Sequence, residues 1–149
     1  MGTTYQTINN VFLGKISDFD LPGMLIEDAE EILYDLMISA ITRFQKVSKS
    51  NLSNRNDKGF IGNLSDVEID ILTEIMVENW LKPKLYNTDL LKNGLSTKDF
   101  SVFSPANLLN AIRNCYELAH SRSESLINKY SFDNNSLVEL KNDLKKGRK

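Results

Sequence analysis

Four stretches of the chain place apolar residues three or four positions apart, a spacing that predicts amphipathic α-helices. These stretches are residues 3–16, 26–47, 65–82 and 104–130. The stripe of apolar residues is most regular in the second stretch, and the fourth opens on Ser-Pro, a strong helix-start signal. The pattern predicts an all-α protein, a helical bundle of about four main helices.

The third stretch, residues 65–82, is expected to be the central helix of this bundle. Its first turn carries a capping-box pattern, with Ser65 followed three residues later by Glu68. Its apolar residues do not fall on one stripe, so it should have neighbours on several sides, and Trp80 should be buried against the second and fourth helices. Pro83 disfavours helical geometry at the residue before it, so we expect the helix to stop or kink there.

Residues 48–63 form the longest polar segment and are rich in Asn, Ser and Gly. This composition predicts a loop or a small hairpin, and long loops inside a domain usually carry a function or are mobile. Phe60 and Ile61 are apolar residues within it, flanked by glycines. They either pack back on the core or insert into a partner subunit.

The remaining segments complete the expected organisation. The sequence pattern predicts a second helical piece over residues 84–95, after the proline, and a short extended segment over residues 96–103. Residues 1–133 are expected to form one helical domain, and residues 134–149 a C-terminal extension or tail. The chain shows no signal peptide and no apolar run that approaches a membrane span.

The C-terminal extension holds the other candidate partner-binding residues. Its apolar side chains recur on one face of a short predicted helix, and a basic end follows. With the two loop residues, the predicted partner-binding set is Phe60, Ile61, Leu137, Leu140, Leu144, Lys145, Lys146, Arg148 and Lys149. The basic end is either a solvated tail or a contact for nucleic acid or an acidic partner.

Candidate catalytic chemistry is missing from the pattern. The one cysteine, Cys115, excludes an intramolecular disulfide and a cysteine-based zinc site, and it suits a reducing compartment. The one histidine, His120, has no neighbours on its helix that make a recognisable triad. Phosphate-binding and dinucleotide-binding glycine patterns are also missing. We therefore expect no catalytic residue, no cofactor and no metal ion, and a protein that is not an enzyme.

Two runs carry a resemblance to a known family: Ile71 to Leu85, and Leu95 to Leu109 with its Asp-Phe and Ser-Pro-Ala-Asn elements. Together they resemble the small head–tail connector proteins of tailed bacteriophages, also called neck or adaptor proteins. The resemblance implies a virion structural protein, made in the host cytoplasm, that forms a homo-oligomeric ring of often about twelve copies. Such a ring would bind the portal protein and a tail or second neck protein, and DNA would pass through it without sequence-specific binding.

An alternative is a soluble helical DNA-binding or regulatory protein. The formal net charge of −2 argues against it, because DNA-binding domains usually present a basic face. The excess of basic residues is instead confined to the C-terminal end of the chain.

Overall fold

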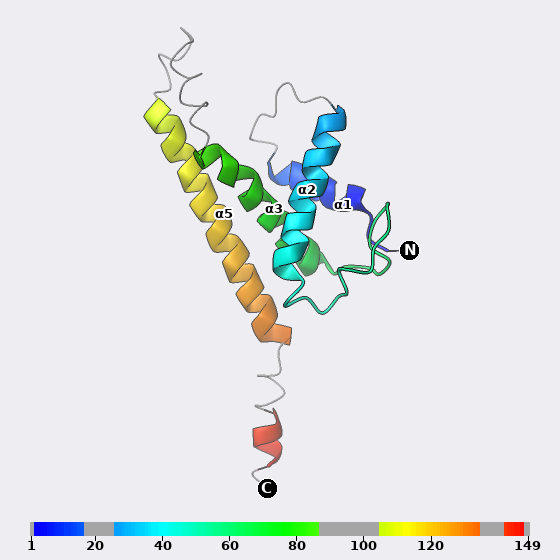
Figure 1. Cartoon of the computed structure of the whole chain (residues 1–149). Helices are drawn as coiled ribbons and strands as arrows, with labels where there is room; N and C mark the ends of the chain where they lie inside the picture. Colours follow the sequence, from blue (N-terminus) through cyan, green and yellow to red (C-terminus); the bar gives the residue numbers. More distant parts are fainter. Residues whose placement is uncertain (1, 17–25, 87–104, 135–141, 148–149) are drawn as a thin grey trace.

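The computed structural model describes residues 2–16, 26–86, 105–134 and 142–147. Its long helices are α1 (Tyr5–Lys15), α2 (Ile26–Phe44), α3 (Asp66–Tyr86) and α5 (Pro105–Asn134), as Figure 1 shows. A further helical turn covers residues 142–146. The described residues include isolated β-bridges but no strand. The predicted all-α helical bundle is confirmed.

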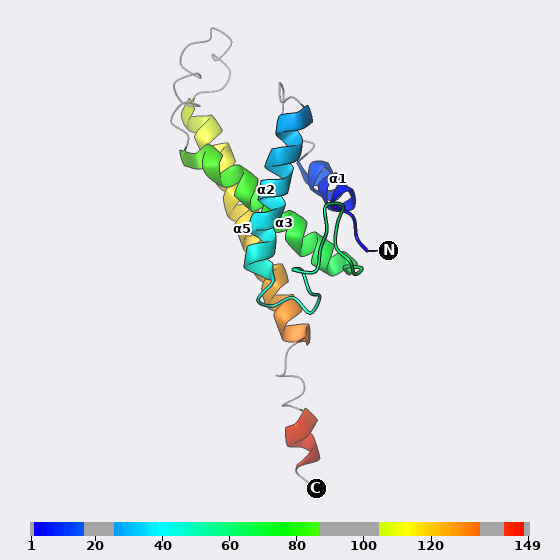
Figure 2. The ribbon, with the colours of Figure 1, turned by 45° about the vertical axis from the view of Figure 1, so that its right-hand side comes forward.

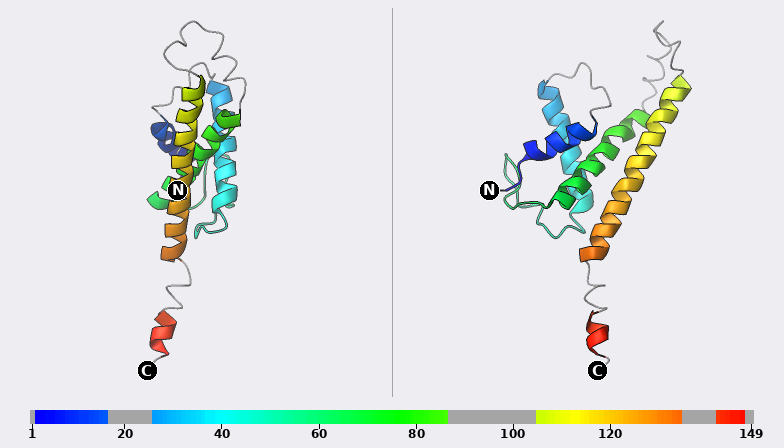
Figure 3. Two further views of the ribbon diagram at one scale, coloured as in Figure 1. Left: turned by 90° about the vertical axis from the view of Figure 1, so that its left-hand side faces the viewer. Right: turned by 180° about the vertical axis from the view of Figure 1, so that it is seen from behind.

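Helix α3 is the centre of the bundle, as the sequence predicts. It packs against α1, α2 and α5, which lie around it in both Figure 1 and Figure 2. Four of its apolar side chains, Ile71, Leu72, Ile75 and Met76, are completely buried. Helix α5 runs alongside α3 in the opposite direction (Figure 3) and is the longest of the described helices. Neighbours on several sides explain why the apolar residues of α3 follow no single stripe.

The helix starts follow local hydrogen bonds that the sequence encodes. In α3, the backbone N–H of Glu68 donates to Ser65 Oγ at 3.2 Å, and the backbone N–H of Ser65 donates to Glu68 Oε2 at 2.9 Å. This reciprocal pair is the predicted capping box. In α1, the backbone N–H of Thr7 donates to the side chain of Thr4 at 3.2 Å. Each cap satisfies backbone groups that would otherwise lack a partner at the helix end.

Of the two predicted outcomes at Pro83, a stop or a kink of the helix, the stop is wrong. Helix α3 continues through Pro83 and ends at Tyr86. A proline lacks one backbone donor, so its position in the last turn removes only one helical hydrogen bond. The Lys84 ammonium lies 4.5 Å from the centroid of the Trp80 ring, a cation–π contact that helps to hold this turn.

Trp80 is buried beside α2, as predicted, with 7% of its surface exposed, whereas its contact with the fourth helix stays a prediction. Beside it lies a small apolar cavity whose other walls come from α1 and α2, including Phe12, Leu33 and Leu36. The first helix, which the prediction for Trp80 did not include, therefore contributes to its surroundings.

The segment 48–63 contains a small hairpin that the N-terminal residues hold in place. Isolated bridges pair Arg55 with Phe60 and Thr4 with Gly59. Asn56 closes the turn of the hairpin: its side-chain oxygen accepts hydrogen bonds from the backbone N–H groups of Lys58 and Gly59. A Cβ atom at Gly59 would lie 2.4 Å from the Thr3 carbonyl oxygen, so only glycine allows this close approach.

Two further predictions fall largely outside the described residues. Of the helical piece 84–95, residues 84–86 belong to the end of α3, and the rest lies outside. The extended segment 96–103 lies entirely outside the described residues.

Candidate functional site

The hairpin separates the two predicted partner-binding residues of the loop. Phe60 is buried in the core, where its ring packs edge-on against Tyr5 at a centroid distance of 5.8 Å. Ile61 is 51% exposed. Successive residues of an extended segment point to opposite faces, which explains the split. Phe60 is therefore a core residue, and Ile61 alone is available on the surface of the hairpin.

The C-terminal candidates that the structure describes lie on the surface of the helical turn 142–146. Leu144 is 69% exposed, and Lys145 and Lys146 are also exposed. Leu137, Leu140, Arg148 and Lys149 lie outside the described residues.

A polar cluster around Glu78, here called the Glu78 cluster, joins α2, α3 and α5. Glu78 is buried, and Arg43 of α2 donates to its Oε2 at 2.6 Å. From α5, the Ser123 hydroxyl donates to Oε2 at 2.7 Å and His120 Nδ1 lies 2.8 Å from Oε1. Arg43 also pairs with Glu124 of α5. The cluster is a polar junction between three helices.

The hydrogen bonds around Glu78 set the charge of its carboxyl group. Burial alone raises the pKa of Glu78, because it penalises the charged form. Hydrogen bonds from Ser123, His120 and Arg43 outweigh this effect and hold the pKa below its ordinary value. The group is therefore an ionised carboxylate near neutral pH.

A serine, a histidine and a glutamate at one place invite comparison with a catalytic triad, but their connection differs. In a triad the histidine lies between the serine and the acid and takes the proton of the hydroxyl. Here Ser123 and His120 each bond directly to Glu78, one to each oxygen. Ser123 is completely buried, so no substrate reaches its hydroxyl. This arrangement fixes helices and does not activate a nucleophile.

A second cluster, the Glu68 cluster, joins α3, α5 and the segment after α2. The Tyr130 hydroxyl of α5 donates to Glu68 Oε1 at 2.8 Å, and the Ser50 hydroxyl donates to Oε2 at 2.9 Å. The backbone N–H of Lys49 donates to the Tyr130 hydroxyl at 2.8 Å. The Tyr130 ring packs edge-on against Phe44 at a centroid distance of 5.2 Å. Glu68 thus serves both the capping box and the docking of α5.

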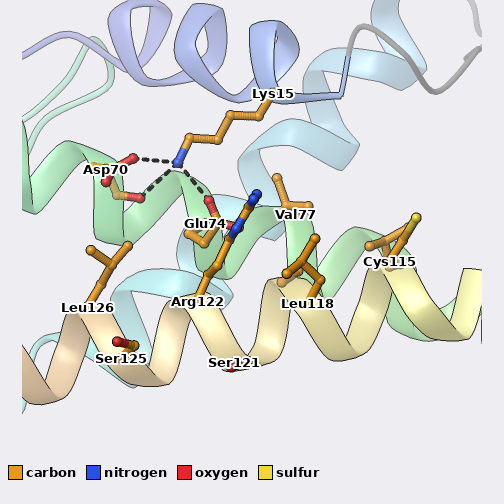
Figure 4. A pocket seen from close by; sticks show the side chains of 12 residues that line it. Lys15, Asp70, Glu74, Val77, Cys115, Leu118, Ser121, Arg122, Ser125 and Leu126 are labelled. Carbon is orange, nitrogen blue, oxygen red and sulfur yellow. Dashed lines mark hydrogen bonds and ion pairs between the residues drawn. The ribbon is translucent and has the colours of Figure 1, made fainter.

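A groove of about 730 Å³ lies between α1, α3 and α5 (Figure 4). Lys15 reaches from α1 to the wall formed by α3, where its ammonium lies 2.6 Å from Asp70 Oδ1 and 2.9 Å from Glu74 Oε2. Arg122 rises from α5 on the other side, and Leu118 and Val77 supply apolar surface. The groove combines an ion-paired wall with apolar surface.

The predictions from sequence missed the three buried glutamates of α3, which are Glu68, Glu74 and Glu78. The capping box identified Glu68 as a cap but not as a contact for α5. The sequence did contain a signal for Glu74 and Glu78: both stand in a helix whose apolar residues are spread over all of its faces. A glutamate on such a helix must be buried beside a donor.

The part of the chain that the structure describes holds no group of three or more His, Cys, Asp or Glu side chains that could bind a metal ion. Among the described helices, none is both long and apolar enough to cross a membrane. Comparisons with protein-family models, with curated proteins and with solved structures each found no match to this chain.

Proposed function

We propose that this chain is a structural subunit of the neck of a tailed bacteriophage, without catalytic activity. Copies of it form a ring between the portal and the tail, and DNA passes through the ring. The proposal starts from the resemblance carried by residues 71–85 and 95–109.

One observation of the fold supports this proposal over a self-contained monomer. The hairpin, which carries exposed Ile61, and helix α5 lie on opposite sides of the bundle in Figure 1 and Figure 3, and α5 carries exposed Leu118 in the groove beside α3. Both side chains are about half exposed. A closed ring joins two different faces of each subunit head to tail, so a ring subunit needs apolar contacts on two separate sides.

The C-terminal extension supplies a third contact in this proposal. Residues 142–147 are exposed, and a helical turn this short is not stable in water without a surface to pack on. We place this surface on the portal or on a neighbouring subunit, with the basic end toward water, an acidic partner or DNA.

The test is assembly on the portal protein of the same virus. Size-exclusion chromatography with light scattering should show the chain joining portal particles, and a particle reconstruction should show a ring at the portal. A monomer in the absence of portal agrees with the proposal, since connector proteins often assemble only on the portal. A compact dimer that binds DNA with strong salt dependence and ignores portal particles would overturn it and favour the regulatory alternative.

A further inference from the structure

Helix α5 is attached to the bundle differently from the other helices. Of its side chains that the structure describes, Ala119, Ser123 and Tyr130 are buried, and most of the others are exposed or half-buried. Grooves of about 730 and 680 Å³ run along its contact with α3. Elements with few buried apolar contacts are those that open locally while the rest of a protein stays folded.

Two polar clusters add to the contacts that half-buried apolar side chains of α5, such as Tyr116, Leu126 and Ile127, make with the core. Buried Glu78 accepts from Ser123 and lies against His120, and buried Glu68 accepts from Tyr130. Each carboxylate therefore makes hydrogen bonds that exist only while α5 is docked.

The charged groups around Glu78 come from three helices. Arg43 of α2 bonds it directly, His120 of α5 faces its other oxygen, and Glu124 of α5 pairs with Arg43. On α3 itself, the preceding turn carries Glu74, whose partner is Lys15 of α1. Protonating Glu78 would leave Arg43 and His120 without their shared anion.

The charged residues that line the second groove together with Glu68 come from three parts of the chain. Lys49 comes from the segment after α2, Asp70 from α3, and Lys129 and Asp133 from α5. Burial alone raises the pKa of Glu68, but hydrogen bonds from Ser65, Tyr130 and Ser50 outweigh this and hold it below the ordinary value. Groups with lowered pKa stabilise the docked state above their ordinary pKa, and this contribution is lost as the pH falls through the lowered value.

We propose that α5 is a releasable arm: protonation of Glu68 and Glu78 frees it from α3 as a unit, while α1, α2 and α3 remain folded together. The contacts among α1, α2 and α3 include the ion pairs of Arg43 with Glu78 and of Lys15 with Glu74, but they also bury a large apolar core, in which Ile8, Phe12, Met37 and Phe44 are almost completely buried. Apolar burial does not depend on protonation, so acid acts first on α5. The arm has two states, docked and released, and proton binding favours the released state.

Hydrogen exchange of the full chain, followed by mass spectrometry, tests this over a series from about pH 7 to about pH 3. Rates are corrected for the intrinsic effect of pH on exchange. Trp80 is the only tryptophan, and its emission reports the α1–α2–α3 core in the same samples. We expect the protection of α5 peptides to fall at least about tenfold relative to α3 peptides before the emission changes. Loss of protection in α3 and α5 together, or no loss in α5, would overturn the proposal.

Variants at neutral pH test whether loss of the carboxylate charge releases α5, without the other effects of acid on the chain. Glu78→Gln keeps the size of the side chain and removes its charge, so α5 should exchange about ten- to a hundredfold faster at neutral pH, with a weaker response to acid. Glu117→Gln is the control: it changes an exposed glutamate of α5, and the exchange of α5 should match that of the unmodified chain. If Trp80 emission shows that Glu78→Gln unfolds the whole chain, Ser123→Ala removes a single α5 donor and should give the same pattern at smaller size. Unchanged exchange of α5 in both variants would refute the release mechanism.

Discussion

Helix α3 is bound to its neighbours by two kinds of contact. Toward α1 and α2 the interface is built mainly from apolar side chains such as Phe12, Ile41 and Phe44, which are almost completely buried, with one ion pair from each helix, Lys15–Glu74 and Arg43–Glu78, beside them. Toward α5 the interface contains the carboxylates Glu68 and Glu78 with their donors. Apolar burial supplies stability but little direction, whereas hydrogen bonds to a buried carboxylate require one alignment. The comparison indicates that the first interface stabilises the fold and the second sets the position of α5 along α3.

The largest effect on this comparison should come from the apolar side. Trp80→Ala removes a large buried side chain beside α1 and α2, and it should destabilise the whole chain by about 3–5 kcal/mol. Chemical denaturation followed by circular dichroism measures this. Leu118→Ala, at an exposed position of α5, is the matched control and should change stability by less than about 0.5 kcal/mol. Near-normal stability of the Trp80 variant would place that side chain outside the core.

A smaller loss of stability is expected in the Glu78 cluster, at the interface of α3 with α5. Glu78→Ala leaves Arg43 and His120 without their shared carboxylate, and both of these are partly exposed, which reduces the cost. We expect a loss of about 1–3 kcal/mol. Glu117→Ala on the exposed face of α5 is the control. Equal unfolding midpoints for the two variants would show that the Glu78 cluster contributes no net stability.

A still smaller loss of stability is expected in the Glu68 cluster. Tyr130→Phe removes the hydroxyl that bridges Glu68 and the backbone of Lys49, but it keeps the ring against Phe44. The expected loss is about 0.5–1.5 kcal/mol, the usual net contribution of a hydrogen bond. Tyr130→Ala should cost more, because it also removes the ring contact. If both variants lose the same stability, the ring contributes nothing and the hydroxyl carries the contact.

The same comparison explains how much of the fold the sequence could predict. The apolar spacing and the local cap at Ser65 predicted the helices and the central place of α3, because both depend on short-range patterns. The predicted end of α3 before Pro83 was wrong. The helix continues to Tyr86, and a contact between Lys84 and Trp80 helps to hold its last turn. Local propensity gives the start of a helix better than its end when side chains support the last turn.

The polar clusters could not be predicted in the same way. Glu78 meets His120 and Ser123, residues more than forty positions away, and no local pattern records that pairing. In the hairpin, the sequence marked Phe60 and Ile61 as unusual but left their direction open. The pairing of Arg55 with Phe60 decides it, because it turns Phe60 inward and Ile61 outward.

The smallest effect on stability should come from the C-terminal extension, which belongs to neither interface of α3. Deleting residues 134–149 removes the last residue of α5 and a segment in which residues 142–147 are all exposed, with Leu144 at 69%. Exposed residues contribute little to the free energy of unfolding, so the melting temperature should stay almost unchanged. If the extension docks on the portal or a neighbouring subunit, however, the truncated chain should fail to join portal particles. Leu144→Ser tests the apolar contact alone and should weaken assembly without any change in melting. A truncated chain that still assembles normally would exclude docking by the extension, whereas one that no longer folds would place its apolar stripe in its own core.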